Sequence, residues 1–281
     1  PFGGWGAAEE PAAGGLDLLL SLGYSVDLLP DWQLEEASSY PFLLLPDWQD
    51  VGPEAVSALV RYVEGGGSLL LCGAENVQLF AGPLGLHAAG PAAEQTLYLA
   101  DENGFAQVPG SWLRLENSSG ETLSSAYPAP DARKDAWPLA LRIARGKGSA
   151  VVCPGPLIST FGLAGSPTLR SQIAKLASGL AAPAFQAEGE QPGLEIVLRT
   201  KDGSTLLHLI NTAGQPVTGQ FRHTGVVPPI APLRFRLRLP AAPRVVFLEP
   251  EGTRLEGEYR DGHWHSQIPA LHVHAAVRFE F

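Results

Sequence analysis

The sequence predicts an α/β domain followed by a small all-β domain. Residues 41–75 read as a strand, a helix and a second strand. Residues 95–125 contain short strand-like runs separated by Asn-Gly, Pro-Gly and Ser-Gly turns. Beyond residue 192 no helical period remains, and alternating apolar and polar residues continue to the end of the chain. The length of 281 residues also fits two domains.

The strand–helix–strand segment is the most regular part of the sequence. Phe42–Leu45 is an unbroken apolar run, which is typical of a strand buried on both faces of a parallel sheet. Pro53 suits the first position of a helix, and Gly65–Gly67 would end it, because glycine adopts the left-handed C-cap conformation without steric cost. Ser68–Cys72 is the next apolar run. Together they predict a right-handed βαβ unit.

The elements before this unit indicate where a ligand would lie. Residues 14–22 predict a helix, and residues 24–29 predict a first strand. The hexapeptide LLPDWQ occurs at residues 28–33 and again at 44–49, so we interpret it as a strand-to-loop turn used twice. In an open parallel sheet these loops lie at the carboxyl edge, where ligands usually bind.

The remaining segments complete the domain plan. Residues 86–137, approximately, predict an antiparallel insertion beside the main sheet, and residues 139–152 predict a hairpin that returns to the sheet. The first domain is expected to span 1–182, with a helix that Ser166 caps near its end. A linker would cover 183–192, and an antiparallel β-sandwich 193–281.

Composition excludes several functional classes. The 29 acidic and 19 basic residues give a net charge of −10, which disfavours binding to nucleic acid or to an anionic membrane. No apolar run approaches the ~20 residues of a membrane span. The chain begins PFGGW without an initiator methionine or signal segment, so we expect a processed chain or a piece of a longer one. Two cysteines leave the compartment open, with the cytoplasm slightly favoured.

Several stretches resemble a known family. YPFLLLPDWQDVGPEAVSALVRYVEGGGSLLL is similar to the domain after the catalytic barrel of family 42 β-galactosidases and fucosidase-like hydrolases. This β-galactosidase trimerisation domain has a flavodoxin-like, class I glutamine amidotransferase-like parallel sheet. GKGSAVVCPGPLISTFG and SPTLRSQIAKLASGL match its closing strand and helix, and STLLHLINTAG and IPALHVHAAVRFEF resemble the β domain that ends such enzymes.

The resemblance implies a non-catalytic C-terminal region of a bacterial glycosidase. Its expected partners are a preceding catalytic barrel and further copies of itself, and its expected role is to assemble the oligomer and shape the approach to the active site. It implies no cofactor. The barrel and its two carboxylates are missing, because nothing here supplies eight βα repeats.

A class I amidotransferase would need a cysteine nucleophile at a tight turn with glycines two residues to either side. Cys72 ends the matching strand, but its neighbours are Leu70 and Ala74. Where the family has His-Pro-Glu, this chain reads Cys153-Pro154-Gly155, so the base and its orienting acid are absent. Without a base the thiol stays protonated. We therefore expect no catalytic residue, and treat Cys72 and Cys153 as degenerate nucleophile and base positions, with adjacent buried thiols favoured over a disulfide.

Aromatic residues beside carboxylates are the candidate binding residues. Trp32 and Trp48 lie at the predicted carboxyl edge beside Asp31 and Asp47, an arrangement that suits a sugar ring and its hydroxyl groups. Trp112 is a further candidate for a carbohydrate-binding module. A domain or subunit interface is the alternative use of these tryptophans and the one that we favour.

Histidines give two weaker hypotheses. His263, His265, His272 and His274 form two His-x-His pairs, and four imidazoles could gather as a metal site if their strands paired in register. We favour surface and packing roles and expect no metal, because so many ligands would have to converge. His87 could replace the missing base of a free-standing amidotransferase-like enzyme, but a loop histidine without a carboxylate is usually only solvated.

Overall fold

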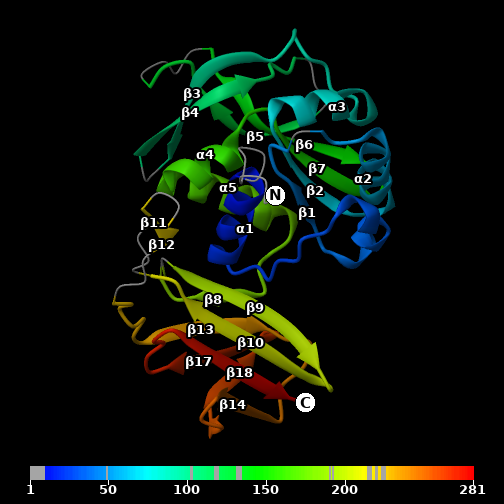
Figure 1. The fold of residues 1–281 in the computed structure, drawn as a ribbon. Coiled ribbons are helices and arrows are strands. Elements are labelled where there is room, and N and C mark those ends of the chain that lie inside the picture. Colours follow the sequence, from blue (N-terminus) through cyan, green and yellow to red (C-terminus); the bar gives the residue numbers. More distant parts are fainter. Residues whose placement is uncertain are drawn as a thin grey trace, which may run out of the picture. The chain divides into compact units, whose positions relative to one another are not determined.

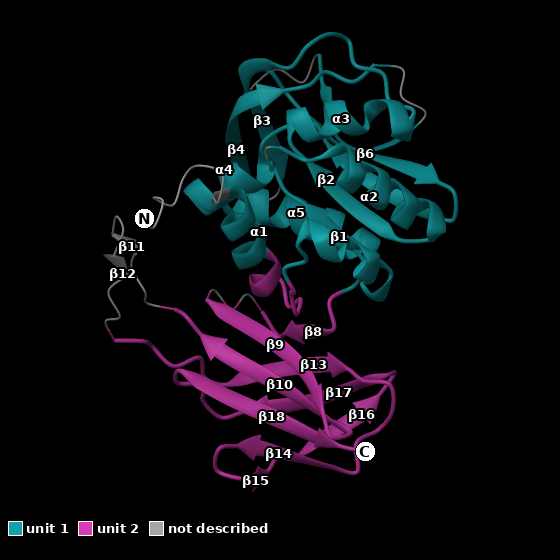
Figure 2. Cartoon of the chain, turned by 45° about the vertical axis from the view of Figure 1, so that its right-hand side comes forward, with its two compact units in different colours: residues 1–18, 28–182 teal, residues 19–27, 183–281 magenta. Residues whose placement is uncertain are grey.

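Two compact units make up the chain (Figures 1 and 2). Unit 1 comprises Pro1–Leu18 and Leu28–Ala182, and unit 2 comprises Leu19–Asp27 and Pro183–Phe281. The computed structural model describes residues 10–48, 50–101, 104–116, 120–130, 135–189, 191, 193–213, 217–218, 221–222 and 226–281.

Unit 1 is built on a five-stranded mixed sheet with the strand order β1-β2-β7-β6-β5. Strands β1 (Leu43–Leu45), β2 (Ser68–Cys72) and β7 (Gly148–Cys153) run parallel. Strands β6 (Trp137–Arg145) and β5 (Glu121–Ala126) are antiparallel additions. The β6–β7 hairpin confirms the hairpin predicted for residues 139–152, and it makes the sheet mixed and not purely parallel. The finer flavodoxin-like assignment stays a prediction.

Helices cover both faces of this sheet (Figures 1 and 2). On one face, α2 (Pro53–Gly65) and α3 (Ala74–Leu84) bury an apolar cluster against β2, β6 and β7. On the other side lie α1 (Glu10–Ser21), α4 (Leu157–Ala164) and α5 (Pro167–Leu180). The sequence signals at the ends of α2 and α5 are confirmed: Pro53 begins α2, Gly66 ends it at φ 122°, and the Ser166 hydroxyl accepts the Leu169 N–H.

Two expectations for unit 1 need correction. Residues 24–29 form no strand, and those up to Asp27 belong to unit 2, where Ser25 Oγ accepts the Leu198 N–H at 3.0 Å. The next residues form a 3₁₀ helix, η1 (Asp31–Ser39). In the predicted antiparallel insertion, β3 (Ala93–Asp101) and β4 (Gly104–Trp112) form a separate hairpin, whereas β5 joins the main sheet.

Unit 2 contains two antiparallel sheets that share one hydrophobic core. The first has the order β15 (Thr253–Arg254), β14 (Val245–Glu249), β18 (His274–Glu280), β10 (Ser204–Asn211) and β9 (Leu194–Lys201). The second has the order β16 (Gly257–Arg260), β17 (His263–Ile268), β13 (Leu233–Arg238) and β8 (Phe185–Ala187). A short pair, β11 (Val217–Thr218) and β12 (Phe221–Arg222), is separate. Strand β8 lies within the segment expected to be a linker.

The alternation along β13 shows why this unit folds as a two-layer sandwich. Leu233, Phe235 and Leu237 face the core, and the intervening arginines face outward, as their spacing of two predicts. Among the described residues, no helix is long and apolar enough to cross a membrane.

Candidate functional site

The two cysteines meet at the carboxyl edge of the parallel strands in unit 1. Cys72 ends β2 and Cys153 ends β7, and the two residues are direct partners in the register. Both are free thiols and are 1% and 0% exposed. The hydrogen bond to Cys153, together with burial, raises the pKa of the Cys72 thiol well above its ordinary value. Cys72 is therefore protonated at neutral pH, which is the opposite of what a nucleophile requires.

The turn after Cys72 has no free oxyanion hole. The positive φ of 96° falls on Gly73, so the thiol itself remains in the strand and not on the tight turn. In an elbow-type active site, the N–H after the nucleophile helps to bind the oxyanion. Here the Gly73 N–H points to the carbonyl oxygens of Cys153, at 3.1 Å, and Gly155, at 3.2 Å. The Gly73 N–H is therefore already hydrogen-bonded within the protein and is not available to an oxyanion.

Asp47 links the loop after β1 to helix α4. Its Oδ2 accepts the Ser159 N–H at 3.0 Å and the Ser159 hydroxyl at 2.5 Å. Ser159 lies in the first turn of α4, so the carboxylate binds one of the N–H groups that have no partner within the helix. Burial raises the pKa of Asp47 to about 6, against the opposing effect of the Ser159 hydrogen bonds. Asp47 is thus a largely buried helix-anchoring residue, which corrects its expected role as a sugar contact.

Asn76 was missed by the sequence analysis. It is 1% exposed, and its Nδ2 donates to the carbonyl oxygens of Pro46, at 2.6 Å, and Cys72, at 2.9 Å. The available signal was a lone amide on the apolar face of the helix after Cys72. These bonds hold the ends of β1 and β2 together, so the carboxyl edge is closed by internal polar contacts.

A catalytic base for Cys72 was expected to be absent. His87 is exposed after α3, and its carbonyl accepts the Glu116 N–H. The groups that shift the pKa of Cys72 are Cys153 and Asp47; no imidazole of the described residues contributes.

The three candidate tryptophans have different environments. Trp112 is 1% exposed, and its Nε1 donates to the Val108 carbonyl at 3.1 Å. Its ring also packs so closely on Gly155 that a Cβ there would lie 2.3 Å away. Trp112 is a core residue and cannot stack on a sugar, which corrects that expectation. Trp48 is 38% exposed and Trp32 80%.

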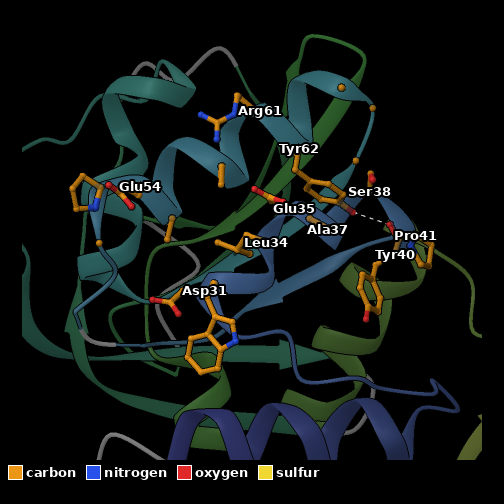
Figure 3. A pocket seen from close by; sticks show the side chains of 18 residues that line it. Asp31, Leu34, Glu35, Ala37, Ser38, Tyr40, Pro41, Glu54, Arg61 and Tyr62 are labelled. Atoms are coloured by element: carbon orange, nitrogen blue, oxygen red, sulfur yellow. Dashed lines mark hydrogen bonds between the residues drawn. The ribbon is translucent and has the colours of Figure 1, made fainter.

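Trp32 and Asp31 line a pocket of about 1130 Å³ between η1 and α2 (Figure 3). Carboxylates of Glu35 and Glu54 and the guanidinium of Arg61 also line it. At one end the Tyr62 hydroxyl donates to the Tyr40 carbonyl at 3.1 Å (Figure 3). An exposed indole beside hydrogen-bonding groups is an arrangement that could contact a sugar or another protein.

The histidines do not gather as the metal hypothesis required. His263 and His265 lie on β17, whereas His274 begins β18 in the other sheet. His274 instead contacts His208 of β10, with 3.2 Å between His208 Nδ1 and His274 Nε2. Among the described residues, no group of three or more His, Cys, Asp or Glu side chains is placed to hold a metal ion.

Comparison with solved structures relates this fold to glycoside hydrolases. No protein-family model and no curated protein matches the sequence. The α-L-fucosidase isoenzyme 2 from Paenibacillus thiaminolyticus superposes with a TM-score of 0.76 at 20% identity, over 97% of this chain and 45% of the fucosidase. A GH42 β-galactosidase from G. stearothermophilus has a TM-score of 0.63 at 12% identity, over 97% of this chain and 36% of its own.

A third structure extends the same pattern. The β-galactosidase from Bacillus circulans sp. alkalophilus has a TM-score of 0.61 at 15% identity, over 97% of this chain and 37% of its own. The chain shares its fold with part of a glycoside hydrolase. It spans less than half the length of each of these proteins.

Proposed function

We propose that this chain is the non-catalytic region of a glycoside hydrolase, and that it assembles the oligomer and shapes the approach to an active site on a separate catalytic barrel. The observation that carries the proposal is the fucosidase match, which includes 97% of this chain, and hence both units, but only 45% of the fucosidase. The unmatched part of the fucosidase leaves room for a catalytic domain. A (β/α)₈ barrel needs about 250 residues.

The closed carboxyl edge supports a role other than catalysis for this chain. The Cys72 thiol is buried, its pKa is raised, and the adjacent Gly73 N–H is bound to backbone carbonyls. Acyl transfer needs an accessible thiolate and free donors for the oxyanion. Neither requirement is met at Cys72 and Gly73, and this supports a role in assembly for the domain.

The exposed apolar side chains near η1 supply a candidate assembly surface. Trp32 is 80% exposed and Leu28 is 71% exposed. Single exposed apolar residues are common on monomeric proteins, but tryptophan is enriched in the buried centres of interfaces. We therefore assign Trp32 as the anchor of a subunit or domain contact.

Light scattering after size-exclusion chromatography tests this assignment. The chain should elute with a mass that is a multiple of 29.7 kDa, and Trp32→Asp should shift it to the monomer. Leu163→Asp is the matched control, because Leu163 is 74% exposed on α4 and should tolerate the same charge. A monomer at every concentration, or equal dissociation by the control, would contradict the proposal.

Carbohydrate binding in the pocket beside η1 is the alternative function. It is favoured by the Trp32 and Asp31 side chains that line the pocket. Galactose or fucose oligosaccharides would then quench tryptophan fluorescence in a saturable way. Trp32→Ala should abolish the quenching, whereas Trp48→Ala should retain it, because Trp48 does not line this pocket.

A free-standing amidotransferase-like enzyme is the last candidate. Glutamine turnover that Cys72→Ala abolishes would support it and would overturn the closed-edge interpretation.

A further inference from the structure

Two histidines on neighbouring strands of unit 2 form a close pair on the sheet face opposite the core. His208 lies on β10 opposite Ala276 of β18, and His274 lies opposite Ile210 of β10. The histidines are therefore diagonal neighbours on the same face of an antiparallel pair. His208 Nδ1 and His274 Nε2 are 3.2 Å apart, and the ring centroids are 5.4 Å apart with an interplanar angle of 18°.

This separation matches two ligands of one metal ion. Zinc binds imidazole nitrogen at about 2.0–2.1 Å, so two nitrogens at tetrahedral positions lie about 3.3 Å apart. In the metal-free chain, one ring can donate its N–H to the other across the same gap. Binding one cation in place of that proton would leave the nitrogen separation nearly unchanged, and the rings would turn until both lone pairs face the ion. Strand β10 is also paired on both sides, with β9 and β18, and this pairing fixes the backbone under His208.

The cation on the neighbouring strand is already neutralised. Arg199 of β9 lies opposite Leu206, two residues from His208, and its guanidinium pairs with Asp27 at 3.3 Å. This ion pair reduces the repulsion that a divalent cation would meet.

We propose that His208 and His274 form a binding site for a divalent transition-metal ion of the Zn²⁺ type. The protein supplies two nitrogen ligands, and the remaining positions are open to water or to a donor from another molecule. Imidazole favours zinc, copper and nickel, whereas magnesium prefers oxygen ligands. The site lies within unit 2 and does not depend on the proposed role in a glycosidase.

A second histidine pair provides an internal control. His263 and His265 are both on β17, and their ring centroids are 6.4 Å apart in an edge-on arrangement. His263 Nδ1 is already 2.8 Å from the Asp261 carbonyl oxygen. This pair offers the same residue types in the same unit, but one of its ring nitrogens already has a backbone partner.

Calorimetric titration of the full chain with ZnCl₂ tests the site, with MgCl₂ as the comparison. One Zn²⁺ should bind per chain, EDTA should reverse the binding, and Mg²⁺ should not bind. Partners outside the coordination sphere already change metal affinity by about 10- to 100-fold, so loss of a ligand should weaken it at least about tenfold. His208→Ala and His274→Ala should each do so, and the double variant His263→Ala/His265→Ala should not.

Three results would overturn the proposal: no Zn²⁺ binding to the parent chain, undiminished binding by His274→Ala, or equal loss in the β17 control. His274 is exposed, so His274→Ala should keep its circular dichroism spectrum and decide the matter even if His208→Ala destabilises the sheet. Histidine side-chain NMR spectra give a second readout. Zn²⁺ should shift the His208 and His274 ring nitrogens and leave those of His265 unchanged.

Discussion

Replacing Asp47 by asparagine should remove one identifiable part of the pH dependence of stability. Asp47 is largely buried, its pKa is raised to about 6 from an ordinary value of 3.8, and its carboxylate accepts two hydrogen bonds from Ser159. Asparagine has nearly the same shape and keeps an oxygen for the Ser159 N–H. The change therefore removes the charge and preserves the helix contact.

The sign follows from which state binds the proton more tightly. A folded-state pKa above the unfolded value means that protonation favours the folded state, so the contribution is full below about pH 3.8 and is lost as pH rises through about 6. A shift of this size corresponds to about 3 kcal/mol in total, of which about 2 kcal/mol is lost between about pH 4 and pH 7. At pH 7 the parent protein carries the cost of a buried, ionised carboxylate.

Urea unfolding of the parent chain and of Asp47→Asn across this pH range measures the effect, because the difference cancels titration of the other groups. The stability of Asp47→Asn relative to the parent should rise by about 2 kcal/mol from about pH 4 to pH 7. Asp31→Asn, which removes an exposed carboxylate from the same unit, controls for net charge. A pH-independent difference for Asp47→Asn would refute the assigned environment.

Two further substitutions test the closed edge. Gly73→Ala should destabilise unit 1 by about 1–3 kcal/mol, because a φ of 96° is strained for alanine and its Cβ would lie 3.0 Å from Asp47 Cα. Gly82→Ala in α3 is the control: its added Cβ meets no atom within 4 Å, so it should be neutral or stabilising by up to about 1 kcal/mol. A lower thermal unfolding temperature for Gly82→Ala than for Gly73→Ala would contradict the strain assigned to Gly73. Asn76→Ala should cost about 2–4 kcal/mol, because it leaves two carbonyl groups without their shared donor; a loss under about 0.5 kcal/mol in urea unfolding would count against it.

Local sequence signals predicted individual elements well. Pro53 and the glycines after residue 64 marked helix α2, and the alternation of leucine, phenylalanine and arginine marked β13. Strand pairing was less accessible, because it depends on residues far apart in the chain. Residues 24–29 were predicted as a strand but pair with no strand in the described structure. The hairpin of residues 139–152 was predicted from its local turn, whereas the pairing of β5 with the main sheet was not.

For the candidate sites too, local features could be predicted from the sequence and long-range contacts could not. The adjacency of Cys72 and Cys153 followed from the expectation that parallel strands end at one edge. The role of Asp47 could not be predicted, because its partner Ser159 is 112 residues away. The His208–His274 contact likewise joins residues separated by 66 positions. Periodicity identifies the face of an element, but the partner of that face is determined by the fold.

Alkylation of the native chain by iodoacetamide, followed by peptide mass mapping, tests most directly whether the carboxyl edge of unit 1 is chemically inert. A buried, protonated thiol reacts only after unfolding. Cys72 and Cys153 should therefore stay unmodified at neutral pH in the native chain and become modified in denaturant. Rapid modification of Cys72 in the native chain, with a rate that reveals a pKa below that of an ordinary thiol, would contradict the account.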